Sequence, residues 1–193
     1  MIDIKHINTI NWSQRKVAVL GAGKSGIASA KLAESIGASV LLSDNGQVEI
    51  SNLDNIEVES GGHSIKVLDY DLLVISPGIS DKISIVKSCI EKQIPVVSEI
   101  EFASWFTASP ILAITGSNGK TTATTLLHHM VKNSGYTSLL GGNIGIPFSE
   151  NVLNEKENNL QNVVHVLELS SFQLEHIHHF SPLISCILNI SPD

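Results

Sequence analysis

Short runs of aliphatic and β-branched residues alternate along the chain with longer stretches that mix apolar and polar positions at helical spacing. This alternation is typical of α/β proteins, in which helices cover a parallel sheet. In the first half of the chain, helices are predicted to begin near Lys24 and Lys82. The predicted strands of this half are residues 16–20, 39–42, 71–75 and 95–97. Together these elements predict one small, doubly wound, Rossmann-like domain.

The same alternation then starts again, which predicts a second α/β domain with a parallel sheet. A helix is predicted over residues 119–133, and another over residues 98–106 would bridge the two domains. The predicted strands of the second domain are residues 111–114, 137–140, 163–167 and 184–188. We therefore place the first domain at residues 1–98 and the second at residues 99–193.

Two further features of the second half bear on its organisation. The polar segment 151–162 is predicted to be an exposed helix end and a loop. The chain ends a few residues after its last predicted strand, in the region where parallel sheets usually build their sites. We therefore expect the second domain to be truncated and the sequence to be a fragment of a longer protein.

Composition and charge limit the range of functions. The chain has 193 residues, of which 42% are hydrophobic and 16% charged, as in a globular protein. Its formal net charge of −7 gives no general attraction for nucleic acid or an anionic membrane. No secretory signal or membrane-spanning run is evident, and Cys89 and Cys186 are expected to be free thiols. A cytoplasmic location is therefore expected.

The first glycine loop (residues 21–26, GAGKSG) has the GxGxxG spacing and lies between a predicted strand and a predicted helix. Asp44 ends the next strand about 20 residues later, which completes a nucleotide-binding fingerprint. The glycines allow the backbone to approach a phosphate at the helix N-terminus. Taken literally, the motif predicts NAD binding, whereas the alternative is a loop that only lets the helix pack tightly. A glycine turn at residues 76–79 would face the same crevice.

The second glycine loop (residues 115–122, TGSNGKTT) follows a buried strand and opens a helix, which is the arrangement of a P-loop. It is a shorter GxxGKT form, because Ile114 stands where the usual pattern has glycine. Lys120 supplies a positive charge for the terminal phosphates, and the Thr121 hydroxyl can bind a magnesium ion. Glu168 ends a neighbouring predicted strand, where its carboxylate could bind the same magnesium directly or through water.

Three segments together resemble the Mur ligase family: TGSNGKTT at 115–122, GGNIGIPF at 141–148 and LELSSFQLE at 167–175. Asn118 and the last segment are similar to the members that add D-glutamate. The resemblance implies a P-loop-type ATPase fold for the second domain, and a first domain that binds UDP and not a dinucleotide. The residues that match uridine and diphosphate contacts are Gly23, Lys24, Ser25, Asp44, Asn45 and Gly78. Asn143 and Ser170 match contacts for the muramoyl-alanine end.

The resemblance also implies the cofactors and the reaction. The residues that match ATP contacts are Gly116, Ser117, Asn118, Gly119, Lys120, Thr121, Thr122 and Ala123. Lys120 and Glu168 match catalytic residues, and Thr121 and Glu168 match magnesium ligands. In this family the γ-phosphoryl group passes to the carboxylate of UDP-N-acetylmuramoyl-L-alanine, and the amine of D-glutamate attacks the acyl phosphate. Further catalytic residues and a C-terminal domain are expected beyond Asp193. The 193-residue chain is therefore expected to be a monomer that binds the uridine nucleotide but lacks ligase activity.

Two other functions remain open from the residues alone. The first glycine loop could serve an NAD-dependent oxidoreductase, or the chain could be a nucleotide-binding module without chemistry. A folate-polyglutamate ligase shares the second glycine loop but lacks a GxGxxG domain in front of it. His176, His178 and His179 are interpreted as a solvated or packed face and not as a metal site, since no third ligand of suitable spacing is evident.

Overall fold

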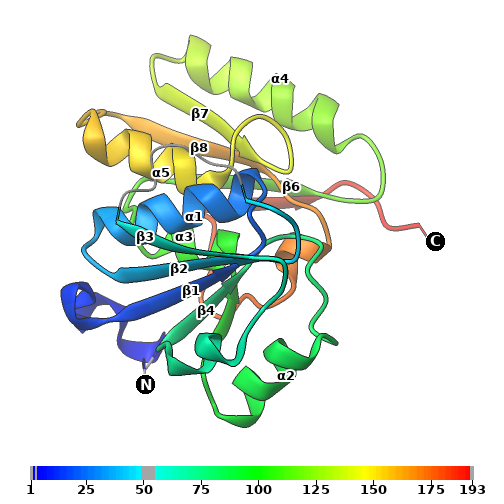
Figure 1. The fold of residues 1–193 in the computed structure, drawn as a ribbon. Helices are drawn as coiled ribbons and strands as arrows, with labels where there is room; N and C mark the ends of the chain where they lie inside the picture. The colour runs from blue at the N-terminus through cyan, green and yellow to red at the C-terminus, as the bar shows by residue number, and fades with distance from the viewer. Residues whose placement is uncertain (1, 3, 49–54, 192–193) are drawn as a thin grey trace.

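The computed structural model describes residues 2, 4–48 and 55–191, which form two parallel sheets with helices around and between them (Figure 1). The first sheet has the strand order β3-β2-β1-β4-β5. Its strands are β1 (Lys16–Leu20), β2 (Ser39–Asp44), β3 (Ile56–Ser60), β4 (Leu72–Ile75) and β5 (Val96–Ser98). The associated helices are α1 (Lys24–Ser35), α2 (Ser84–Glu91) and α3 (Glu99–Ser104). The order places the ends of β1, β2 and β4 side by side.

The second sheet has the order β7-β8-β6-β9, and every paired strand in both sheets is parallel. Its strands are β6 (Ile111–Thr115), β7 (Thr137–Gly142), β8 (Val163–Glu168) and β9 (Ile184–Ile187). Its helices are α4 (Lys120–Asn133) and α5 (Phe148–Glu157). Short 3-10 helices cover Ile4–Thr9, Trp12–Gln14, Ile65–Asp69 and Phe172–Leu174. The predicted fold class, parallel α/β throughout, is confirmed.

The elements stack in layers, with α1, α3 and α5 between the two sheets (Figure 1). Helix α4 lies on the outer face of the second sheet, and α2 on the outer face of the first. Alternate residues of β1 reach opposite faces: Val17 and Val19 join the core between the sheets, and Ala18 and Leu20 join the core under α2. The core between the sheets also contains Phe148 of α5, so both sheets share one apolar interior.

Most predicted elements are present within two residues of their expected ends, and two differences have physical causes. Strand β3 was not predicted, because its sequence IEVES alternates Ile and Val with glutamates on an exposed edge of the sheet. Segment 151–162 contains the predicted helix end and loop, but its first residues are not exposed as predicted, because α5 packs inward there and buries Asn151. The Asn151 side chain donates a hydrogen bond to the Leu140 carbonyl (3.1 Å). Strand β5 ends at Ser98, and the domain boundary there stays a prediction.

Two glutamates of α3 are buried between the sheets. The Ser98 hydroxyl caps this helix by accepting a hydrogen bond from the Glu101 N–H (3.3 Å). The Glu101 carboxylate accepts hydrogen bonds from the indole N–H of Trp105 (2.8 Å) and from the backbone N–H groups of His178, His179 and Phe180 (2.8–3.0 Å). A buried charge requires such partners, and here they attach the segment after β8 to α3.

Glu99 has fewer partners. Its Oε1 atom accepts a hydrogen bond from the Ser149 N–H at the start of α5, while Oε2 is buried with no hydrogen-bond partner among the described residues. Burial raises the pKa of Glu99 to about 7, although the N–H of Ser149 favours the ionised form. This carboxyl therefore holds a proton through the weakly acid range.

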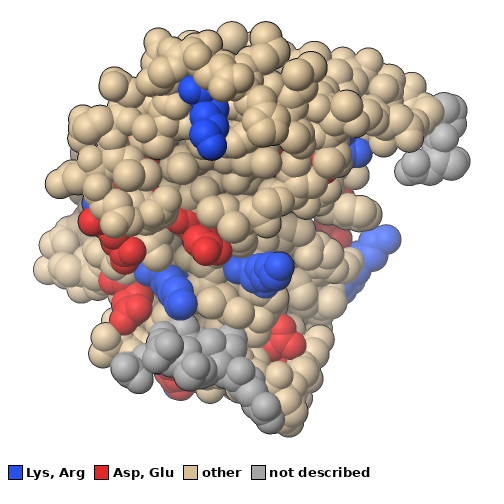
Figure 2. All heavy atoms as spheres, turned by 90° about the horizontal axis from the view of Figure 1, so that it is seen from above, with Lys and Arg blue, Asp and Glu red and all other residues tan. Residues whose placement is uncertain are grey.

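Two features of the described residues concern possible membrane and nucleic-acid partners: the hydropathy of the helices and the charges on one face. Within the described part of the chain, none of the helices has both the length and the hydropathy needed to cross a bilayer. The face in Figure 2 carries lysines or arginines interspersed with acidic side chains, and no continuous basic patch gathers on it.

Replacing Glu99 tests the pH dependence that its burial implies. Because its folded pKa lies above the ordinary value of 4.5, the folded state binds the extra proton, and stability falls as pH rises from about 4.5 to about 7. The expected loss in the free energy of unfolding is on the order of 3 kcal/mol. Chemical denaturation across this range should show that slope in the wild type, reduced in Glu99→Gln and retained in the exposed control Glu157→Gln. An unchanged slope in Glu99→Gln would contradict the assignment.

Candidate functional site

The second glycine loop connects β6 to α4 at the carboxyl end of the second sheet. Gly119 is the N-cap of α4 and has a positive φ of 82°, which favours glycine. Gly116 has a φ of 144°, and a Cβ atom there would come within 3.1 Å of the Asn189 carbonyl oxygen. The N–H groups of Lys120, Thr121 and Thr122 begin the helix and so have no intrahelical partner. These groups and the helix dipole provide a place for an anion.

The Lys120 ammonium lies across this loop. Its Nζ atom donates hydrogen bonds to the carbonyls of Gly116 (2.7 Å) and Ser117 (3.2 Å). Carbonyl oxygens are weaker acceptors for an ammonium than the charged oxygens of a phosphate. The two bonds hold the ammonium against the loop, at the position where an anion would approach. A phosphate could replace the carbonyls as its acceptor.

Glu168 connects the loop to the neighbouring strand. It ends β8, which is paired with β6, and its side chain is only 1% exposed. The Thr121 hydroxyl donates to its Oε2 atom (2.8 Å), and the Asn143 amide donates to its Oε1 atom (2.7 Å). The Asn143 N–H also donates to the Glu168 carbonyl (2.8 Å). Three residues from three separate segments, Thr121, Asn143 and Glu168, thus meet at one carboxylate at the carboxyl ends of adjacent parallel strands.

A cavity of about 640 Å³ opens beside the second glycine loop. Ser170 lines it, and its N–H and hydroxyl both donate to the Gln173 Oε1 atom (3.0 and 3.2 Å). The predicted loop residues that also line it are Gly116, Ser117, Asn118 and Lys120. The structure therefore brings Ser170 to the same cavity as the loop, whereas Thr121, Glu168 and Asn143 do not line it.

The first glycine loop lies at the carboxyl end of the other sheet. Gly26 is required there, because a Cβ atom would fall 1.7 Å from the Gly21 carbonyl oxygen. Asp44 Oδ2 accepts a hydrogen bond from the Ala22 N–H (2.5 Å), and Oδ1 accepts one from the Gly46 N–H (2.7 Å). These bonds, chiefly that from Ala22, lower the pKa of Asp44. The Asp44 carboxylate thus holds the first glycine loop against the end of β2.

The other residues predicted around the first glycine loop are spread over its rim. Gly23 is the N-cap of α1, and Asn45 is exposed next to Asp44. Gly78 has a φ of 91° in the turn after β4. Ser25 is partly buried, whereas Lys24 lines a separate cavity of about 530 Å³ between α1 and α5. Lys24 therefore lies beside the first glycine loop and also at the contact between α1 and α5.

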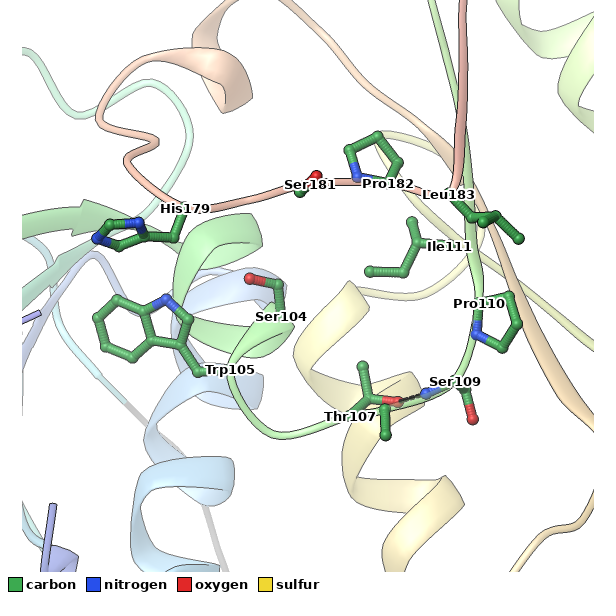
Figure 3. Close-up of a pocket in the computed structure, with 11 residues that line it drawn as sticks. Ser104, Trp105, Thr107, Ser109, Pro110, Ile111, His179, Ser181, Pro182 and Leu183 are labelled. Atoms are coloured by element: carbon green, nitrogen blue, oxygen red, sulfur yellow. Dashed lines mark hydrogen bonds between the residues drawn. The ribbon is translucent and has the colours of Figure 1, made fainter. Parts of the chain in front are cut away.

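A further cavity, of about 600 Å³, lies away from both glycine loops. Figure 3 shows it between α3, the segment leading into β6 and the segment before β9, with Trp105 and His179 at one end. The Ser109 N–H donates to the Thr107 hydroxyl on its wall (3.0 Å). None of the residues predicted for the site lines this cavity.

The three histidines of segment 176–179 lie in a loop and not on a helix. His178 and His179 donate their backbone N–H groups to Glu101, and the His176 carbonyl accepts a bond from the Ser98 N–H (3.1 Å). Among the described residues no group of three or more His, Cys, Asp or Glu is arranged to hold a metal ion. The backbone of these residues thus attaches the segment to β5 and α3, while the side chains of His178 and His179 are exposed.

The sequence did not identify Asn189, which the structure places against the second glycine loop. Asn189 Oδ1 accepts a hydrogen bond from the Asn118 N–H (2.9 Å), and its Nδ2 donates to the Asn118 carbonyl (3.0 Å). The available signal was its place just after a predicted strand, where site residues gather in parallel sheets.

Comparison with known proteins agrees with this arrangement. Residues 16–85 match the model of the MurD N-terminal domain, and residues 114–193 match that of the Mur ligase middle domain. A UDP-N-acetylmuramoylalanine–D-glutamate ligase of Christiangramia forsetii is 45% identical over 93% of this chain and 40% of its own length. A ligase of the same name from Salinibacter ruber is 41% identical over 92% of this chain and 40% of its length. The chain thus spans about 40% of these curated relatives.

Solved structures agree on the fold. A murein peptide ligase from Psychrobacter arcticus superposes with a TM-score of 0.58 at 18% identity, covering 93% of this chain and 44% of that one. A UDP-N-acetylmuramate–alanine ligase from Thermotoga maritima gives 0.52 at 21% identity, covering 93% and 42%. The two domain models, the curated relatives and the shared fold lead to one conclusion: the chain belongs to the Mur ligase family.

Proposed function

We propose that the chain forms the uridine-nucleotide-binding and phosphate-binding parts of an ATP-dependent ligase that adds D-glutamate to UDP-N-acetylmuramoyl-L-alanine. The observation that carries the proposal is the contact of Thr121 and Asn143 with the buried Glu168 carboxylate beside the second glycine loop. A carboxylate that is buried and that would lie near a bound phosphate has an electrostatic cost, which a bound cation would offset.

The residues of the second glycine loop fit a magnesium–ATP complex by their chemistry. The Thr121 hydroxyl and the Glu168 carboxylate are hard oxygen donors of the kind magnesium prefers. The helix N-terminus from Lys120 to Thr122 offers N–H groups to phosphate oxygens, and the Lys120 ammonium can exchange its carbonyl acceptors for them. The ATP, when bound, supplies the phosphoryl group that activates the substrate carboxylate.

The chain's own residues would then act by positioning and by neutralising charge. Lys120 would stabilise negative charge on the transferring group, and Glu168 would hold the metal in a fixed orientation because Asn143 holds its other oxygen. Ser170, on the wall of the same cavity, would contact the acceptor end of the substrate. The remaining predicted contacts, from Gly116 to Ala123, belong to the loop and the first turn of α4.

The first glycine loop would hold the UDP group. Its backbone approaches the diphosphate at the N-terminus of α1, with Gly23, Lys24 and Ser25 at the rim. The ionised Asp44 carboxylate keeps lone pairs for a ribose or base beyond the two N–H groups it binds. Asn45 and Gly78 border the same crevice.

The rest of the proposed enzyme concerns residues outside this sequence. We place the D-glutamate site and further catalytic groups in the part of the relatives that the chain does not span. A cytoplasmic location, a monomeric state and the absence of nucleic-acid and membrane partners are part of the same proposal. A Rossmann-like NAD-dependent oxidoreductase and a module without chemistry are the competing functions.

Titration of the purified chain with UDP and NADH distinguishes the proposed ligase from an NAD-dependent oxidoreductase. UDP should bind and NADH should not, and Asp44→Asn should weaken UDP binding by about tenfold or more, because a hydrogen bond to a charged group is lost. The exposed control Asp69→Asn should bind UDP as the wild type does. Calorimetry or fluorescence measures the affinity of the wild type, of Asp44→Asn and of Asp69→Asn. Tight NADH binding without UDP binding would favour the oxidoreductase.

Lys120→Ala tests the catalytic role of the lysine in a protein extended to the length of its curated relatives. Loss of a charge aimed at the transferring phosphoryl group should lower kcat by roughly 10²- to 10³-fold. Phosphate release measured with all three substrates gives the rate. Lys132→Ala, at the exposed end of the same helix, is the matched control and should retain full turnover. Near-normal turnover of Lys120→Ala would refute the role.

Glu168→Gln tests the metal role separately in the same extended protein. The amide keeps the shape of the carboxyl group but lacks its charge, so the magnesium concentration for half-maximal rate should rise about 10- to 100-fold. The measurement is the rate as a function of magnesium at saturating nucleotide. A lower rate of Glu168→Gln with the same magnesium dependence as the wild type would contradict the metal role of Glu168.

A further inference from the structure

The segment after β9 continues alongside the second glycine loop beyond the end of the regular sheet. The Leu188 N–H donates to the Thr115 carbonyl (3.0 Å), and the Ser117 N–H donates to the Asn189 carbonyl (3.0 Å). The Ser191 N–H donates to the Ser117 hydroxyl (2.9 Å). The pairing of β6 with β9 therefore extends through the loop itself.

At the centre of this pairing, the Asn189 side chain makes two hydrogen bonds with the backbone of Asn118. Its Oδ1 accepts from the Asn118 N–H (2.9 Å), and its Nδ2 donates to the Asn118 carbonyl (3.0 Å). We propose that Asn189 is a positioning residue for the second glycine loop, which it holds in a phosphate-ready shape through the backbone of Asn118. The inference rests on the proposed function for what the loop binds.

The chemistry of asparagine suits this position. Only a neutral amide side chain offers one donor and one acceptor at the spacing of a peptide group. Aspartate could accept from Asn118 but not donate to it, and its charge would oppose a phosphate nearby. Because Asn189 also lines the cavity beside the loop, the position demands both hydrogen-bonding modes and no charge.

The contact also determines which backbone donors remain for an anion. Asn189 occupies the N–H groups of Ser117 and Asn118, one through its carbonyl and the other through its side chain. The donors that remain for an anion include those at the start of α4, which point along the helix dipole. Fixing the loop beforehand avoids the ordering cost that a mobile loop would pay on binding.

Three variants of the 193-residue chain separate the side chain from the backbone. Asn189→Ala removes both side-chain bonds, Asn189→Asp keeps the acceptor alone, and Asn158→Ala is a control at an exposed asparagine that bonds only within its own turn. Amide hydrogen exchange followed by NMR reports on each loop N–H. In Asn189→Ala, exchange at Asn118 should accelerate about threefold to tenfold, while Ser117, which is bonded to the Asn189 carbonyl, keeps its rate.

Binding is measured with inorganic tripolyphosphate in the presence of magnesium. Its affinity should fall about threefold to tenfold in Asn189→Ala and at least as far in Asn189→Asp, although Asn118 stays protected in Asn189→Asp. UDP affinity should be unchanged in all three variants, since UDP is assigned to the other sheet. Circular dichroism verifies that each variant is folded.

Two results would overturn the inference: an Asn118 exchange rate in Asn189→Ala equal to that of the wild type, or faster exchange without any loss of tripolyphosphate affinity. Failure of the wild type itself to bind tripolyphosphate would instead count against the proposed function. In that case the exchange rates still decide whether Asn189 orders the loop, so the two failures remain distinguishable.

Discussion

The burial of two carboxylates in a six-residue helix constrains how the two sheets meet. Glu99 and Glu101 of α3 enter an apolar core that both sheets share, and each must be neutralised or paired there. Glu101 is paired with three consecutive backbone N–H groups after β8, and Glu99 is stabilised mainly by its proton. The hydrogen bonds of Glu101 attach the segment after β8 to α3, which follows the last strand of the first sheet. The packing of the two sheets and the geometry of the site are therefore coupled.

The site itself follows from parallel topology. Strands β6, β8 and β9 end at the same edge, and residues after β6 contact Glu168 of β8 and Ser191 after β9, which lie 47 and 74 positions further along the chain. A rigid strand supports each of the three, while glycines supply the backbone freedom of the loop between β6 and α4. The phosphate site that we propose there would need few charged residues, which agrees with the formal net charge of −7.

The sequence was sufficient for the parts of the protein that depend on local pattern. The runs KVAVL and LLVI are buried on both faces, so their strands were predictable, as were the glycine loops that follow strands. The contacts of Asn189 and Glu101 were not, because their partners lie 71 to 79 residues away and neither residue type marks its partner. The histidines of segment 176–179 were interpreted as a solvated or packed face, but their backbone contacts depend on a loop conformation that no periodicity encodes.

Strand β9 stands at the edge of its sheet, and all four of its residues are exposed. Ile184 and Ile187 are more than 60% exposed, and Leu183 just before them is 70% exposed. An open strand edge with apolar side chains is a template for pairing with another chain. At high concentration, β9 of one molecule is therefore expected to pair with a strand of another molecule. The 193-residue chain should accordingly be purified and stored in dilute solution.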